Sequence, residues 1–475
     1  MPAPTTATEL LDRLRKSALV PADRLDGFLA ALTATGTPPL GPNELLDRLV
    51  TGGMITRFHA DKLAAGKYKG FQLGSYLILD QIGTGGMGQV FLAEHTNMRR
   101  LVALKVLPPV MFEEPVARER FHREARAAGT LDHPNIVRVY DLCQEGKVLY
   151  LVMEYVEGVS LQTLVAKHGP LDVTAACHYA RQVAFGLQHA HELGFIHRDI
   201  KPANLLLERS GLVKVLDLGL VRSEAEAASG LTKQLDNKHI LGTADYVAPE
   251  QAVDSSRVDA RADIYALGAT LYFLLAGRPL FPEGRTAQKL VWQQIKEPTP
   301  ISTLRPEVPA GLARVVHRML QKKPADRYST VVEVFEALAP FDADDVPPPP
   351  TGLIPEPTAR VAQARGSTLG TAPARGTGGT SQILVAAMRG GGSGGSSAAL
   401  KLDTTPARAG APKSGTGSSP TVARAVGDTD ANAPPAPPPV PQRPAGAPGQ
   451  TVLLVALSVA LILALAGIVI LLARG

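Results

Sequence analysis

The sequence predicts an α+β fold for residues 76–339, in which short strands come first and helices follow. Residues 76–82 and 90–94 have the apolar composition of two strands on either side of a glycine-rich loop, and residues 102–107 resemble a third strand. Residues 118–127 have helical character, and a strongly apolar helix opens at Asp263.

The loop between the first two strands has the pattern G-x-G-x-x-G-x-V. Such a pattern is weak alone, because glycines also mark ordinary turns and dinucleotide-binding folds. A dinucleotide-binding loop opens into a helix, whereas a strand follows this loop. The arrangement predicts a flap whose main-chain amides approach phosphate groups. The phosphate-binding residues expected here are Ile82, Gly83, Thr84, Gly85, Gly86, Met87, Gly88, Gln89 and Val90.

The third strand carries one lysine, Lys105, among apolar residues. Burying an unpaired ammonium is costly, so this side chain needs anionic partners. We expect the α- and β-phosphates of a nucleotide and one glutamate to provide them. Glu124, in the helix-like residues 118–127, is the best candidate for the glutamate.

Residues 197–204 have the sequence HRDIKPAN, which places a carboxylate, a cation and a carboxamide in one loop. Asp199 can accept the proton of an attacking hydroxyl, and Asn204 can hold a metal ion. Lys201 can offset charge on the transferring phosphoryl oxygens. Asp217 follows the strand of residues 213–216 and suits a second magnesium ligand. Together these residues predict phosphoryl transfer.

In these motifs, their order and the segment GTADYVAPE at 242–250, residues 76–339 resemble a protein kinase catalytic domain of the bacterial, eukaryotic-like Ser/Thr type. The resemblance implies a bilobal fold, with a small antiparallel sheet and one helix, a larger helical lobe, and ATP between the lobes. The forms of the glycine loop and of residues 201–204 favour the Ser/Thr branch over the tyrosine branch. Leu218 stands where the family most often has phenylalanine, and its apolar side chain can fill the same position.

The resemblance also implies roles for single residues outside these motifs. The expected set comprises the gatekeeper Met153, the adenine-contacting hinge residues Glu154, Tyr155 and Val156, a buried ion pair of Glu250 with Arg327, and Asp263 as a brace of the catalytic loop.

The implied function is a Ser/Thr protein kinase that transfers the γ-phosphate of ATP to protein substrates. Mg²⁺ is the expected metal, with Mn²⁺ as an alternative. Two other functions stay open. A pseudokinase scaffold usually lacks an essential residue, whereas Lys105, Asp199, Asn204 and Asp217 are all present. A small-molecule kinase of similar fold would have no use for residues 242–250, which form a peptide-substrate platform in protein kinases.

Arg198 directly precedes the catalytic aspartate, and kinases with this arginine are commonly activated by phosphorylation of the activation loop. A phosphate of nearly two negative charges can pair with the guanidinium and order the loop. Thr232 is the first candidate phosphosite and Ser229 the second, both beside Gly230. We expect autophosphorylation there, with self-association of kinases tethered in one membrane.

The chain has 475 residues and a formal net charge of +5. Its basic residues are dispersed, which gives no support for nucleic-acid binding. Cys143 and Cys177 are the only cysteines. We interpret both as small core residues in a reducing compartment, without a disulfide framework.

Residues 340–450 are rich in Pro, Gly, Ser and Ala, which predicts a disordered linker. Residues 451–473 carry no charge and would span roughly 34 Å as a helix, enough to cross a bilayer core. No signal peptide begins the chain. We therefore expect a single-pass protein of the cell (inner) membrane with its kinase domain in the cytoplasm.

Residues 1–70 are predicted to form a small helical region of unknown role. The sequence ELLDRL at 9–14 recurs at 44–49, which indicates either two hairpin-like repeats or a chance similarity of two helices. Residues 60–74 resemble the segment that leads into planctomycete-type kinases.

Overall fold

The computed structural model describes residues 2–34, 40–85, 88–107, 118, 119, 122, 125, 126, 128–216, 243–254, 258–343, 346–350 and 352–354. Within these residues, no helix is both long and apolar enough to cross a bilayer. Several predictions lie outside the described residues: the span 451–473, most of the linker 340–450, and the residues Gly86, Met87, Glu124, Asp217, Leu218, Ser229 and Thr232.

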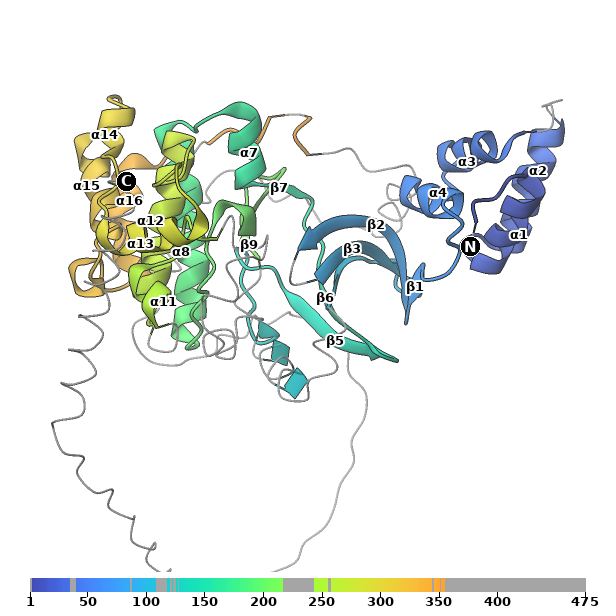
Figure 1. The fold of residues 1–475 in the computed structure, drawn as a ribbon, viewed down its shortest axis with the longest axis horizontal. Coiled ribbons are helices and arrows are strands. Elements are labelled where there is room, and N and C mark those ends of the chain that lie inside the picture. Colours follow the sequence, from blue (N-terminus) through green and yellow to red (C-terminus); the bar gives the residue numbers. More distant parts are fainter. Residues whose placement is uncertain are drawn as a thin grey trace, which may run out of the picture. The chain divides into compact units, whose positions relative to one another are not determined.

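The N-terminal helical unit, residues 2–71, is built from the two copies of the repeated sequence. Equivalent positions have equivalent environments: Leu14 and Leu49 are both fully buried. Ala18 and Gly53 follow the first helix of each copy in the left-handed region, with φ of 54° and 66°. Each copy is therefore a pair of helices. The helices are α1 (Ala7–Ser17), α2 (Ala22–Ala34), α3 (Pro42–Thr51) and α4 (Arg57–Ala64) (Figure 1).

The small lobe is a curved antiparallel sheet with the strand order β1-β2-β3-β4-β6-β5 (Figure 1). The strands predicted around the glycine loop and Lys105 are confirmed as β2, β3 and β4. Gly85 pairs with Gly88, so the described residues of the glycine loop form the paired ends of the β2–β3 hairpin. The described residues between 118 and 128 include a helical stretch. The strands are β1 (Gln72–Leu73), β2 (Tyr76–Gly85), β3 (Gly88–His95), β4 (Leu101–Val106), β5 (Val139–Glu145) and β6 (Val148–Glu154).

The large lobe is mainly helical and centres on α12, the apolar helix that the sequence predicts from Asp263. Every residue of α12 from Ala262 to Leu275 is buried, because other helices surround it. The free Cys177 is likewise buried, on α8. The elements are β7 (Gly158–Ser160), α7 (Leu161–His168), α8 (Val173–Glu192), η1 (Pro202–Asn204), β8 (Leu205–Glu208), β9 (Val213–Val215), α11 (Pro249–Val253), α12 (Arg261–Ala276), α13 (Thr286–Ile295), α14 (Ile301–Leu304), α15 (Ala310–Met319), η3 (Pro324–Asp326), α16 (Val331–Leu338) and η4 (Ala339–Phe341).

Packing on the large lobe continues past residue 339, where the sequence predicts the linker to begin. Asp342 is buried in ion pairs with Arg181 and His178 of α8. Leu353 and Ile354 are also buried, and Arg209 donates to the carbonyl of Ile354 at 3.1 Å. Asp342, Leu353 and Ile354 of the predicted linker are therefore packed on the large lobe. The first linker residues gain enough apolar contact and charge pairing to be held against the lobe.

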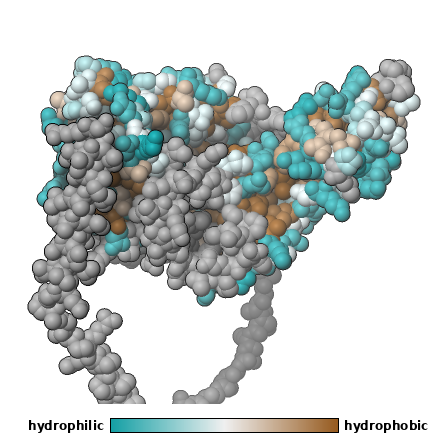
Figure 2. Space-filling model, in the orientation of Figure 1, coloured by the Kyte–Doolittle hydropathy of each residue, from teal (hydrophilic) through white to brown (hydrophobic). Residues whose placement is uncertain are grey.

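The visible surface mixes hydrophilic residues with separate hydrophobic patches (Figure 2). Large apolar side chains that are exposed, such as Met98 and Ile295, lie far apart in the chain. Most of the other described large apolar residues belong to the cores of the helical unit and the two lobes.

Candidate active site

The predicted catalytic loop brings its polar side chains into one hydrogen-bonded group. Lys201 Nζ lies 2.8 Å from Asp199 Oδ2 and 2.9 Å from Thr243 Oγ1. Asn204 Nδ2 donates to the same carboxylate oxygen at 3.0 Å and to the Asp199 carbonyl at 2.9 Å. Asp199 and Asn204 are largely buried. The arrangement therefore fixes a carboxylate beside an ammonium group, and Thr243 holds that ammonium group from outside the loop.

Asp263, the third residue of α12, supports the catalytic loop through hydrogen bonds to its main chain. Its two carboxylate oxygens accept from the main-chain N–H of His197 and of Arg198, each at 2.8 Å. Complete burial by itself would raise the pKa of Asp263, but hydrogen bonds and charge from His191 and His197 outweigh it and hold the pKa below the ordinary value. The ionised brace supports Arg198 in the left-handed region, with φ of 62°. The predicted brace is confirmed.

A second support reaches the loop from α11. Gln251 Nε2 donates to the carbonyl of Arg198 at 2.8 Å. The neighbouring Glu250 forms a two-pronged ion pair with Arg327, with both N···O distances at 2.7 Å. This confirms the predicted ion pair. The contact made by Gln251 has no signature in the sequence, because its acceptor is a main-chain carbonyl.

Lys105 is buried in the middle of β4, where its neighbours in the sheet are Val90 of β3 and Leu151 of β6. A hydrophobic cluster beside it combines Ala103 and Val156 with Leu206 of the large lobe. Apolar side chains from both lobes next to an ammonium group suit contact with a flat ring that carries phosphates. Ala103 and Leu206 escaped sequence analysis because small and apolar strand residues carry no chemical signature.

The residues around Asn204 suit a divalent cation. The amide nitrogen of Asn204 donates two hydrogen bonds to Asp199. The amide oxygen Oδ1 is therefore the atom of this side chain that can bind a metal ion. Leu216, which directly precedes Asp217, donates to the Asn204 carbonyl at 2.8 Å, and its own carbonyl accepts from His197 Nε2 at 2.7 Å. Leu216 therefore lies next to the catalytic loop. Among the described residues, no three His, Cys, Asp or Glu side chains form a metal cluster.

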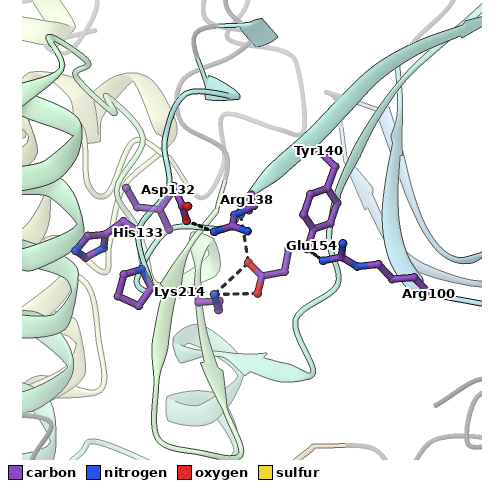
Figure 3. A pocket seen from close by; sticks show the side chains of 9 residues that line it. Arg100, Asp132, His133, Arg138, Tyr140, Glu154 and Lys214 are labelled. Atoms are coloured by element: carbon purple, nitrogen blue, oxygen red, sulfur yellow. Dashed lines mark hydrogen bonds and ion pairs between the residues drawn. The ribbon is translucent and has the colours of Figure 1, made fainter. Parts of the chain in front are cut away.

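The side chain of the hinge residue Glu154 faces a separate pocket of about 380 Å³ (Figure 3). Lys214 of β9 lies 2.9 Å from Glu154 Oε1, and the main-chain N–H of Arg138 donates to Oε2 at 3.2 Å. Burial, with His189 and Lys214 nearby, lowers the pKa of His133 to about 4, so its ring is neutral. The predicted site residues Lys105 and Asp199 do not line this pocket. The remaining lining residues are Arg100, Asp132, Pro134, Ile136 and Tyr140.

Known proteins resemble the part of the chain that contains the glycine loop and the catalytic loop. The chain is 40% identical over 273 residues to the serine/threonine-protein kinase Pkn1 of Myxococcus xanthus, covering 57% of this chain and 38% of that protein. It is 38% identical over 273 residues to PrkC of Bacillus subtilis, covering 57% and 41%. It is 38% identical over 283 residues to PknB of Mycobacterium tuberculosis, covering 58% and 44%. The chain thus spans less than half the length of these relatives.

Among solved structures, the kinase domain of PknI from Mycobacterium tuberculosis has a TM-score of 0.46 at 30% identity, covering 57% of this chain and 96% of that one. Residues 76–338 match the family model of the protein kinase domain. This match extends over more than half of the chain and contains both the glycine loop and the catalytic loop. The chain therefore belongs to the protein kinase family.

Proposed function

We propose that the chain is a serine/threonine protein kinase that transfers the γ-phosphate of ATP to hydroxyl groups of proteins. The observation that carries the proposal is the group formed by Asp199, Lys201 and Thr243, with Lys201 Nζ within 2.9 Å of both partners. A carboxylate and an ammonium group at one point suit an acceptor hydroxyl and a transferring phosphoryl group. The names of the relatives, all Ser/Thr kinases, support the same assignment.

In this proposal Asp199 orients the acceptor hydroxyl and takes its proton as the new O–P bond forms and the bond to ADP breaks. Lys201 lies against the same carboxylate and stabilises negative charge on the transferring group. Asn204 restrains the Asp199 carboxylate through its amide nitrogen. The loop thus presents its groups in a fixed arrangement before substrate binds, which lowers the cost of orienting them.

The nucleotide is assigned to the glycine loop, residues 82–90, and to Lys105, with Glu124 as the lysine's partner. Because the Glu154 side chain is paired with Lys214, we assign its adenine contact to the main chain, together with Val156. Asn204 and Asp217 would hold Mg²⁺, or Mn²⁺ in its place. The bound metal would neutralise phosphate charge.

Incubation of the full-length protein with radiolabelled ATP and Mg²⁺ is expected to label the enzyme itself and a generic protein substrate on Ser or Thr. Phosphoamino-acid analysis identifies the acceptor. A Lys105→Ala variant should lose most of the labelling, since removing one preorganised charge costs about 2.7–4 kcal/mol of transition-state stabilisation. Nucleotide binding without any transfer would contradict the proposal, as would label found only on tyrosine or on a small molecule.

The same labelled enzyme tests the proposed regulation. We assign autophosphorylation to Thr232, with Ser229 as the second site, in self-associated kinases. The phosphate would pair with Arg198, whose main chain is fixed by Asp263 and Gln251. Phosphopeptide mapping should find label at these residues. A Thr232→Ala, Ser229→Ala double variant that keeps full activity would show that this loop is not the switch.

We further propose that residues 451–473 anchor the chain in the cell membrane as a single span, with the kinase domain in the cytoplasm. Their uncharged sequence supports the proposal. Deleting residues 451–475 is expected to move the protein from the membrane fraction to the soluble fraction with its kinase activity retained. Recovery of the full-length protein entirely in the soluble fraction without detergent would contradict the anchor.

A further inference from the structure

Strand β2 contains an irregularity just before the glycine loop. Its register against β3 steps from the pair Ile78–Ala93 to the pair Asp80–Leu92, so Leu79 has no partner in that ladder. Such a β-bulge disrupts the ladder and increases the local twist. The bulge residue is nevertheless fully buried. Its carbonyl therefore needs a hydrogen-bond donor from outside the strand pair.

Helix α4 of the N-terminal helical unit supplies that donor. Thr56 Oγ1 donates to the Leu79 carbonyl at 2.6 Å, and His59 Nε2 donates to the Ile78 carbonyl at 2.6 Å. His59 Nδ1 accepts from the Thr56 main-chain N–H at 3.2 Å, which places the ring proton on Nε2. Both side chains are buried. We call these two hydrogen bonds to β2 the clasp.

The same helix also contacts the other strand of the hairpin. The Phe58 ring lies edge-on to the ring of Phe91 on β3, with centroids 6.2 Å apart. Phe91 pairs with Gln81 of β2, close to where the glycine loop begins. Helix α4 therefore holds both strands of the glycine-loop hairpin at its base.

The internal repeat provides a comparison within the chain. At the offset of 35 residues, the first copy has Pro21 in place of Thr56 and Arg24 in place of His59. Pro21 and Arg24 are exposed, whereas Thr56 and His59 are buried against β2. The core positions of the repeat match in both copies, so the clasp is an addition specific to the second copy.

We infer that Thr56 and His59 are positioning residues that hold the β2–β3 hairpin so that the glycine loop can bind the phosphates of the nucleotide. The inference rests on the proposed kinase function. Adenosine would contact the apolar cluster around Ala103, Val156 and Leu206, but it has no phosphates for the glycine loop to bind. Loss of the clasp should therefore weaken binding of a phosphorylated nucleotide selectively.

The test compares ADP with Mg²⁺ and adenosine as probes, by calorimetric titration of the full-length protein in detergent. Thr56→Val keeps the shape of the side chain and removes the hydroxyl. It should raise the Kd for ADP about five- to tenfold, the effect of losing about one buried hydrogen bond, with the Kd for adenosine within about twofold. Thr56→Ser should restore the wild-type ratio of the two constants. Arg24→Ala, at the position equivalent to His59, should leave it unchanged.

A Thr56→Val protein in which the ratio of the Kd for ADP to the Kd for adenosine is unchanged would overturn the inference. An equal rise of both Kd values would also overturn it, because it would indicate a general loss of folding. If this variant does not fold, Phe58→Leu decides in the same way. It removes the ring contacts of Phe58 to Phe91 of β3, His59, Phe71 and Lys62 and leaves the hydroxyl of Thr56 in place. A wild-type protein that binds neither probe would contradict the kinase function itself, so the two failures are distinguishable.

Discussion

Replacing Asp199 with asparagine is expected to lower kcat for phosphotransfer by about 10²- to 10⁴-fold, the usual contribution of a general base. Asparagine has the same shape and can still accept from Lys201, but it cannot take the proton of the acceptor hydroxyl. Asp199 contacts Lys201 and Asn204 of the catalytic loop. The Kd for ADP should therefore stay within about twofold of the wild-type value, as expected for a residue that acts only in the transition state.

Single-turnover phosphotransfer and ADP titration on the same preparation separate these two effects. Asp172→Asn is the matched control, because Asp172 caps α8 and asparagine caps a helix equally well. Its kcat should be that of the wild type. An Asp199→Asn protein that kept more than about a tenth of wild-type kcat would assign the base to another residue.

The sequence predicts those parts of the fold in which a charged residue interrupts an otherwise apolar strand or helix. Lys105 stands out because it is a cation within an apolar strand, and Asp263 because it begins an apolar helix. Asp199 and Asn204 lie within one loop, so their proximity follows from sequence separation alone. The repeat was visible because its core leucines, Leu14 and Leu49, recur at a fixed offset.

Contacts between distant segments were not predictable in the same way. Glu154 and Lys214 form their ion pair across 60 positions of sequence, and neither residue type is unusual for an exposed site. The clasp was hidden for another reason: the acceptors of Thr56 and His59 are main-chain carbonyls, which have no sequence signature. Leu353 and Ile354 fall within the predicted linker because the composition around them is rich in proline.

The ion pair of Glu250 with Arg327 joins three segments of the large lobe, and its loss is expected to destabilise that lobe strongly. The guanidinium of Arg327 is fully buried and uses all five of its N–H donors. Two donate to Glu250, and the others donate to carbonyls of Gln321, Arg261 and Lys322. Lysine cannot reproduce this planar set, so Arg327→Lys should be destabilising as well as Arg327→Ala.

Arg327→Ala would leave the Glu250 carboxylate and three carbonyls without their donor, at a cost of about 3–5 kcal/mol of unfolding free energy. Thermal and denaturant unfolding of the large lobe should show this as a fall in melting temperature of roughly 10 °C. Arg15→Ala removes an ion pair whose two side chains are mostly exposed, and should change the free energy of unfolding by about 0–1 kcal/mol.

Because Glu250 adjoins Gln251, which donates to the Arg198 carbonyl, Arg327→Ala should also reduce kcat at temperatures where the protein is folded. If Arg327→Ala unfolded like the Arg15→Ala control, the buried ion pair would not be a determinant of stability.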